Sequence, residues 1–285
     1  MRDDFAVFIL SHGRCDRMRT YNTLNRQGYT GKVYIIIDNE DETASQYVEK
    51  FGEDKVIIFD KKKYEKSTDT ADISGNNQAV VFARNACFDI AANLGLRYFL
   101  QLDDDYTYFR FRYEKSGSLL TTKSMNLDLL FSYTLDFLND SGALTVALGQ
   151  GGDYIGGVRS QLWKHRLRRK AMNAFFCDVE KPFKFFGRLN EDVNMYTLYG
   201  NQGELIFTVA DAHLNQVDTQ SLKGGLTDIY LQYGTYRKSF YSVIYSPQCV
   251  KISEIGVKHK RIHHRINWNY CTPLILSEAY KKKSS

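Results

Sequence analysis

The sequence predicts an α/β fold, with a mainly parallel central sheet flanked by helices and a C-terminal elaboration. Two observations support this prediction. Over residues 5–105, short β-branched runs alternate with polar stretches that have helical spacing. The stretches between the runs are long enough for crossover helices, which parallel strands require. With 285 residues, 43% of them apolar, the chain can bury one sizeable core.

The first hundred residues divide into four strands joined by helices. The apolar runs predict strands over 5–11, 32–38, 55–60 and 97–105. The connections predict one helix with Met18, Tyr21 and Leu24 at helical spacing, a second over 43–51 and a third over 76–95.

The third of these helices carries an apolar repeat at intervals of three and four. This spacing predicts a buried stripe made of Val80, Ala83, Cys87, Ile90 and Leu94. Gly95 stands where a helix C-cap belongs, because glycine adopts the left-handed conformation without strain.

The second half of the chain is less regular. A helix is predicted over 126–139, a strand over 143–149 and a glycine-rich loop over 149–157. Only three prolines occur, and no stretch has the composition of a linker. We therefore expect one domain over 1–219, with a basic and aromatic extension over 220–285 packed on it.

Each predicted strand of the first half ends in a polar residue, namely Ser11, Asp38, Asp60 and Asp103. Ligands of open parallel sheets bind outside the carboxyl ends of the strands. Ser11, Asp38 and Asp103 are expected along one edge there. No GxGxxG follows the first strand, so the fingerprint of a dinucleotide-binding fold is absent.

Three consecutive carboxylates follow the fourth strand, in FLQLDDDY (99–106). Asp103 and Asp105 can face the same way, because side chains alternate along a strand. Two carboxylates that close raise the pKa of one of them unless a cation lies between them. Mg²⁺ and Mn²⁺ prefer such oxygen ligands and are completed by substrate phosphates. An acidic turn is the alternative, but the position after a buried strand favours a metal site on Asp103 and Asp105.

With these residues the chain resembles the GT-A glycosyltransferases, whose hallmark is a strand that ends in an acidic DxD-type motif. SHGR (11–14) looks like the nucleotide-contacting loop of that family, Asp38 like the acid that contacts the nucleoside, and ARN (83–85) like the element whose arginine approaches the donor. The resemblance implies a UDP-sugar donor and a Mn²⁺ or Mg²⁺ ion. It implies donor contacts from Ser11, Arg14, Asp38, Arg84, Asp103 and Asp104.

The stretch RLNEDVNMY (188–196) resembles the acidic pair at the start of a helix in inverting members of the family. There one carboxylate deprotonates the acceptor hydroxyl, which is otherwise a poor nucleophile. Asp192 is the preferred base, with Glu191 second. The alternative is that both acids complement the helix dipole and that Asn190 caps the helix.

Two further features remain open between a structural and a functional role. His213, expected to follow a strand, is a candidate third metal ligand, with His259 and His263 as rivals. In the glycine-rich loop, the backbone at Gly152 can approach a sugar and Asp153 or Tyr154 can supply a hydrogen bond. The alternatives are a structural histidine and an ordinary turn.

The net charge of +5 is concentrated in two clusters, WKHRLRRK (163–170) and KHKRIHHR (258–265). Such clusters indicate contact with a polyanion, although each could be a solvated surface. The basic C-terminal part and the motif spacing resemble the TET-associated glycosyltransferases of phages, which implies 5-hydroxymethylcytosine in DNA as the acceptor. A target base within a duplex must be flipped out, and Trp163, Tyr154 or Trp268 could stack on it.

The predicted function is therefore metal-dependent transfer of a hexose or pentose to a hydroxyl group. A nucleotidyltransferase acting on a sugar phosphate and a non-catalytic DNA-binding module are the alternatives. Neither a signal peptide nor an apolar span is found, and the five cysteines follow no metal-binding or disulfide pattern. A cytoplasmic protein, in the host if phage-encoded, is expected.

Overall fold

The structure is a computed structural model of the chain. It describes residues 1–71, 79–122, 126–165, 167–168, 170–216, 227–255, 260–271 and 277–281, without the side chains of 167–168 and 227–235. No helix in these ranges is both long and apolar enough to cross a membrane.

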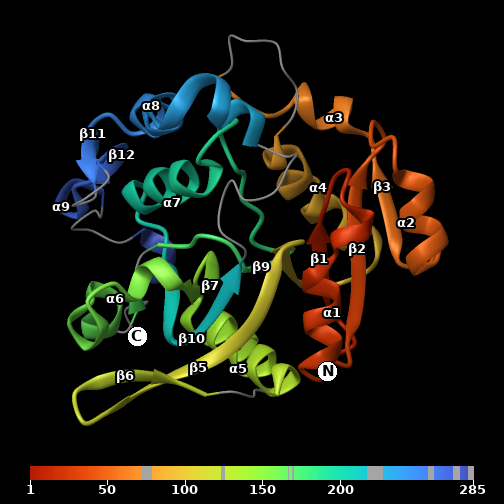
Figure 1. The fold of residues 1–285 in the computed structure, drawn as a ribbon, viewed down its shortest axis with the longest axis horizontal. Helices are drawn as coiled ribbons and strands as arrows, with labels where there is room; N and C mark the ends of the chain where they lie inside the picture. The colour runs from red at the N-terminus through yellow and green to blue at the C-terminus, as the bar shows by residue number, and fades with distance from the viewer. Residues whose placement is uncertain are drawn as a thin grey trace.

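The N-terminal half of the sheet is parallel, as predicted. Its strands are β1 (Phe5–Leu10), β2 (Lys32–Asp38), β3 (Val56–Phe59) and β4 (Tyr98–Asp103), in the spatial order β3-β2-β1-β4. The two central strands, β1 and β4, are apolar runs buried on both faces along nearly their whole length, which is typical of a parallel sheet under helices. Since β2, β1 and β4 are neighbours, their carboxyl ends form one rim (Figure 1).

The other half of the sheet mixes parallel and antiparallel strands, so the mainly parallel prediction holds only for the first half. The order continues β9-β7-β10-β5-β6, and β9 runs antiparallel to both of its neighbours. These strands are β9 (Phe175–Asp178), β7 (Thr145–Gln150), β10 (Ile206–Gln216), β5 (Tyr106–Lys115), β6 (Ser118–Thr121) and the short β8 (Leu167–Arg168). The β5–β6 hairpin extends away from the body in Figure 1.

Helices cover both faces of the sheet. They are α1 (Arg19–Arg26), α2 (Ala44–Phe51), α3 (Lys61–Glu65), α4 (Val80–Asn93), α5 (Leu127–Ser141), α6 (Gln161–His165), α7 (Glu191–Asn201), α8 (Thr227–Tyr245) and α9 (Trp268–Cys271). Alternate side chains of β1 enter two cores: Phe5, Val7 and Ile9 pack with α1, α2 and α5, and Ala6, Phe8 and Leu10 with α4 and α7. Short 3-10 helices occur at η1 (Cys15–Arg17), η2 (Gly151–Tyr154), η3 (Gly157–Arg159) and η4 (Glu278–Tyr280).

The stripe predicted for α4 is partly wrong. Cys87 and Ile90 are buried, but Val80 and Ala83 are only half-buried and Leu94 is 39% exposed. The helix is apolar around most of its circumference and contacts β1, β2 and β4 as well as α3. Its periodicity therefore does not select one buried face. Gly95 does follow the helix in a left-handed conformation, with φ +66°.

The C-terminal elements pack around α7. α8 contacts it, and the antiparallel ribbon β11 (Val250–Ile255) and β12 (Arg261–Ile266) packs on α8. Thr197 of α7 bonds Ser246 through their hydroxyls at 2.9 Å. The predicted division at 219/220 falls outside the described residues and stays a prediction.

Candidate active site

The register between β1 and β4 sets the geometry of the rim. Leu10 pairs with Asp103, so the next residues, Ser11 and Asp104, leave the sheet side by side. Ser11 Oγ donates a hydrogen bond of 2.7 Å to Asp104 Oδ2. The first-strand loop and the acidic motif are therefore directly linked, as their positions at strand ends predicted.

A chain of hydrogen bonds holds the 11–14 loop on Asp104. The backbone N–H of Arg14 donates to the Tyr47 hydroxyl at 2.8 Å, and that hydroxyl lies 2.8 Å from Ser11 Oγ. Because the single Ser11 proton is directed to Asp104, Tyr47 donates to Ser11. Arg14 Nη1 also pairs with Asp104 Oδ1 at 3.2 Å. Burial raises the pKa of Asp104, while Arg14 and Ser11 favour its ionised form.

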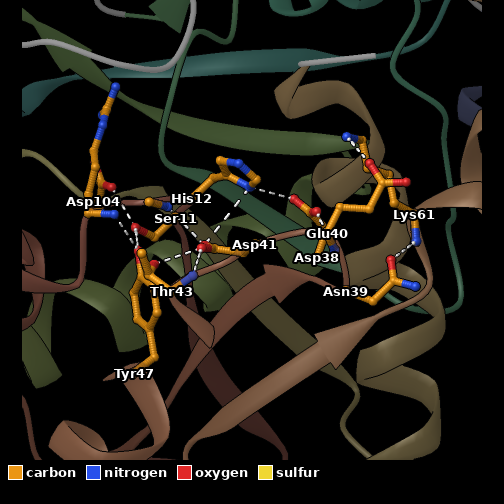
Figure 2. A network of polar contacts seen from close by, with 12 residues as sticks. Ser11, His12, Asp38, Asn39, Glu40, Asp41, Thr43, Tyr47, Lys61 and Asp104 are labelled. Atoms are coloured by element: carbon orange, nitrogen blue, oxygen red, sulfur yellow. Dashed lines mark hydrogen bonds and ion pairs between the residues drawn. The ribbon is translucent and has the colours of Figure 1, made fainter. Parts of the chain in front are cut away.

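A second network lies at the end of β2 (Figure 2). His12 Nδ1 and Asp38 Oδ2 are 2.8 Å apart, and the Gly13 N–H donates to Asp41 Oδ2 at 2.8 Å. The hydrogen bond that Asp38 accepts from the His12 ring raises the pKa of His12. Burial on its own would raise the pKa of Asp38, but the hydrogen bond with His12 and the charge of its ring lower that pKa overall. Asp41 was missed by the sequence analysis, although it stands in the same acidic IIIDNED stretch.

The third network is a buried ion-pair chain centred on Arg84 of α4. Its Nη2 lies 3.0 Å from Asp103 Oδ1, and its Nε lies 3.0 Å from Glu191 Oε1. The guanidinium also stacks on Phe175, 5.0 Å from the ring centre. Burial alone would lower the pKa of Arg84, but the two carboxylates raise it above its ordinary value. Arg84, predicted to approach the donor, thus joins the acidic motif to the start of α7.

Asp105 differs from its two neighbours. It is half-buried, and its carboxylate accepts no hydrogen bond from another described residue. Burial, followed by the charges of Asp103 and Asp104, raises its pKa to about 7. A cation beside Asp105 would relieve this unfavourable environment.

Asp103 and Asp105 fit a hard cation that a substrate completes. The described residues contain no group of three His, Cys, Asp or Glu side chains placed to hold a metal. Two carboxylates plus phosphate oxygens are nevertheless a usual set for Mg²⁺. Two guanidinium N–H groups in these networks, Arg84 Nη1 and Arg14 Nε, are buried without a partner among the described residues. Diphosphate oxygens would satisfy such donors.

The predicted base lies in the first turn of α7. Asn190 has left-handed φ/ψ angles of 56° and 36°, a conformation that Asn tolerates, and its side chain does not cap the helix. Glu191 is buried on Arg84, and burial raises its pKa despite that partner. Asp192 is only half-buried, and its carboxylate accepts a hydrogen bond from the backbone N–H of Val193 at 2.8 Å. Between the two acids, Asp192 is therefore the more accessible.

The structure does not bring His213 to the acids. It lies inside β10, not after the strand as predicted, and pairs with Arg110. The β5–β10 register puts it about 13 Å along the sheet from Tyr106, the residue that follows the acids. Its Nδ1 lies 3.1 Å from the Arg110 carbonyl oxygen, and burial lowers its pKa to about 4. Of its rivals, His263 lies in β12 and His259 lies outside the described residues.

The glycine-rich loop forms η2 and η3. Asp153 accepts the Gln150 N–H at 3.0 Å and pairs with Lys170, while Gly152 is exposed. Tyr154 is buried and donates to the Ala210 carbonyl at 2.8 Å. These contacts favour a structural role for Asp153 and Tyr154.

The three aromatic candidates for base stacking are already packed. Tyr154 and Trp163 share one buried cluster, so neither presents a free ring face at the surface. Trp268 stacks on Tyr196 at 5.9 Å between ring centres.

The two basic clusters approach each other in space. Burial, then nearby positive charges that include Lys170 of the first cluster, lowers the pKa of His263 and of His264 in the second. The side chains of 166–169 and residues 258 and 259 lie outside the described part.

One protein-family model matches most of the chain. Residues 5–225 match the model of the TET-associated glycosyltransferase family, which confirms the predicted resemblance to that family. No curated protein sequence matches the chain significantly.

Similar solved structures include three proteins at low identity. TarS 1–349 of S. aureus is 12% identical, with a TM-score of 0.45, over 76% of this chain and 61% of that one. The mannosyltransferase PcManGT from Pyrobaculum calidifontis, in complex with GDP-Man and Mn²⁺, is 11% identical, with a TM-score of 0.48, over 78% of this chain and 59% of that one. Glucosyl-3-phosphoglycerate synthase from Mycobacterium tuberculosis, in complex with Mg²⁺ and UDP, is 10% identical, with a TM-score of 0.47, over 92% of this chain and 87% of that one. The chain thus spans about six tenths of the first two structures.

Proposed function

We propose that this chain, which belongs to the TET-associated glycosyltransferase family, transfers a sugar from a UDP-sugar to a hydroxyl group in DNA. The acceptor we propose is the hydroxymethyl group of 5-hydroxymethylcytosine. The family description supports a modified-DNA acceptor, and the two basic clusters supply the phosphate neutralisation that DNA binding requires.

One observation carries the proposal. The buried guanidinium of Arg84 contacts both Asp103, at the rim of the sheet, and Glu191, the neighbour of Asp192. One buried side chain therefore holds both an acid proposed for the metal and the residue that directly precedes the proposed base. A transferase needs these two functions on either side of the reacting carbon, in fixed relation.

In the proposed mechanism, Asp103 and Asp105 would hold the divalent ion. When bound, Mn²⁺ or Mg²⁺ neutralises charge on the departing diphosphate as a Lewis acid. Arg14 orients the loop that contacts the diphosphate, and Asp38 accepts a hydrogen bond from the nucleoside. Asp104 positions that loop through Ser11. His213 is left out of the metal site because of its place in β10.

On the acceptor side, Asp192 takes the proton of the attacking hydroxyl. Glu191 is unsuited to this step, because its carboxylate is buried against Arg84. Arg84 acts here as a positioning residue that keeps Glu191, and with it the first turn of α7, in place.

Incubation with a panel of UDP-sugars and Mn²⁺, with and without hydroxymethylated DNA, tests the proposal. We expect release of UDP that depends on DNA, and a DNA mass increased by one sugar. Unmodified DNA of the same sequence is the matched control. A mass gain of one nucleotide would indicate a nucleotidyltransferase. DNA binding without any UDP release would indicate a non-catalytic module.

A further inference from the structure

The C-terminal ribbon has two chemically different faces. In the β11–β12 register, Lys251 pairs with Arg265, Ser253 with His263 and Ile255 with Arg261. Residues that pair directly lie on the same face of a ribbon. These six side chains therefore form one surface, which we call the outer face, and the alternate residues form the inner face.

The outer face carries positive charge without compensation. Lys251, Arg261 and Arg265 are all exposed, and none forms an ion pair with any residue that the structure describes. Glu254, the acid of β11, lies on the inner face and pairs with Lys260 at 3.3 Å. Lys251 and Arg265 are directly opposite each other, and like charges in that position destabilise a sheet. A partner that supplies negative charge would remove this repulsion.

The inner face connects the ribbon to the proposed base. Asn190 Nδ2 lies 3.2 Å from His264 Nδ1, and it donates to the Lys238 carbonyl of α8 at 2.9 Å. Asn190 immediately precedes Glu191 and Asp192. Burial, then the charges of His263, Lys238 and Lys170, lowers the pKa of His264 to about 3, so the ring is neutral and accepts this contact. The ribbon thus contacts the residue that directly precedes the first turn of α7.

We propose that the outer face of the β11–β12 ribbon binds the phosphate backbone of the nucleic acid whose base is modified. This inference rests on the proposed function and adds the surface that holds the acceptor. A two-stranded ribbon can follow the groove of a duplex, and contacts from Lys and Arg to phosphates set the register of a bound nucleic acid. Lys251 belongs to neither basic cluster of the sequence and reaches Arg265 only through strand pairing.

The double variant Lys251→Gln/Arg265→Gln tests this surface. Binding of fluorescent hydroxymethylated DNA would be measured by anisotropy across a series of salt concentrations. Loss of two phosphate contacts makes the slope of log K against log[salt] less negative by about 1.8. At 0.1 M salt that corresponds to binding weaker by roughly 10- to 100-fold.

Two matched variants serve as controls. Lys62→Gln/Lys66→Gln removes the same charge from exposed positions at α3, which is separated from the ribbon by α8 in Figure 1, and we expect wild-type slope and affinity. Lys251→Arg/Arg265→Lys keeps the charge and should keep the slope. Circular dichroism melting of all variants separates lost contacts from lost folding.

Two outcomes would overturn the inference, and they are distinguishable. If the wild type glycosylates DNA but Lys251→Gln/Arg265→Gln binds with the same slope as the α3 variant, the ribbon is not the docking surface and the proposed function stands. If the wild type releases UDP only with an acceptor that is not a nucleic acid and shows no DNA binding, both proposals fail.

Discussion

The rim of the parallel sheet and the outer face of the β11–β12 ribbon treat charge in opposite ways. At the rim, Arg84 pairs with two carboxylates in a buried setting, and Asp104 is held by Arg14 and Ser11. On the ribbon, Lys251 and Arg265 face each other in solvent with no acid on their face of the described strands.

This difference corresponds to two kinds of ligand. Buried, paired groups have fixed positions, which suits a small donor and a reaction that needs exact geometry in a low dielectric. Exposed like charges bind a polyanion by releasing its counterions, with little need for fixed geometry. Substitutions at the rim should therefore change catalysis or folding, while those on the ribbon should change affinity and its salt dependence.

The largest expected effect is at the border between the two regions. Asp192→Asn removes the proposed base, so turnover should fall by about 10²- to 10⁴-fold, with the DNA affinity and melting temperature close to wild type. The rate of UDP release at saturating donor and DNA measures the turnover. Asp136→Asn, an exposed acid on α5, is the control. A variant with near wild-type turnover would exclude Asp192 as the base.

Arg84→Met tests whether the rim depends on its buried pairs. It leaves two carboxylates without their cation, and we expect a loss of about 3–5 kcal/mol in the free energy of unfolding. Urea denaturation measures it. Arg2→Met, which breaks the exposed pair with Asp4, should cost about 1 kcal/mol or less. Equal losses in the two variants would mean that the Arg84 chain is not a structural centre.

Asp105→Asn separates function from stability within the rim. Because the variant lacks the second carboxylate of the metal site, its turnover should be at least about 100-fold lower than that of the wild type. The free energy of unfolding of the metal-free protein at pH 8 should be unchanged or larger, because burial and two neighbouring acids already disfavour the ionised form of Asp105. Wild-type turnover in this variant, with chelator present, would falsify the metal role.

The smallest effect concerns the His12–Asp38 pair, at the exposed border of the rim. Asp38 raises the pKa of His12, so the pair stabilises the protein fully below pH 6.5 and is lost as pH rises through the raised pKa. In Asp38→Asn, the pKa of His12 should return toward its ordinary value, as followed by NMR titration. Glu40→Gln removes a nearby charge that pairs with Lys61 instead, and should leave His12 almost unaffected.

Much of the fold and part of the site followed from local sequence patterns. The runs that became β1, β2 and β4 each end in a polar residue, and parallel strands place such ends on one rim. Ser11, Asp38 and Asp103 could therefore be predicted together. The antiparallel β9 and the β5–β6 hairpin were not predicted, because pairing direction depends on partners remote in sequence.

The sequence by itself determined which residues can do chemistry and at which strand ends they stand, since burial periodicity and strand length are local properties. Only the tertiary structure decided their partners. It directed Asp104 to Ser11 and Asp103 to Arg84, enclosed His213 within β10, and placed Lys251 opposite Arg265. The physical reason is that register and packing between distant segments set which side chains meet, and no local spacing encodes them.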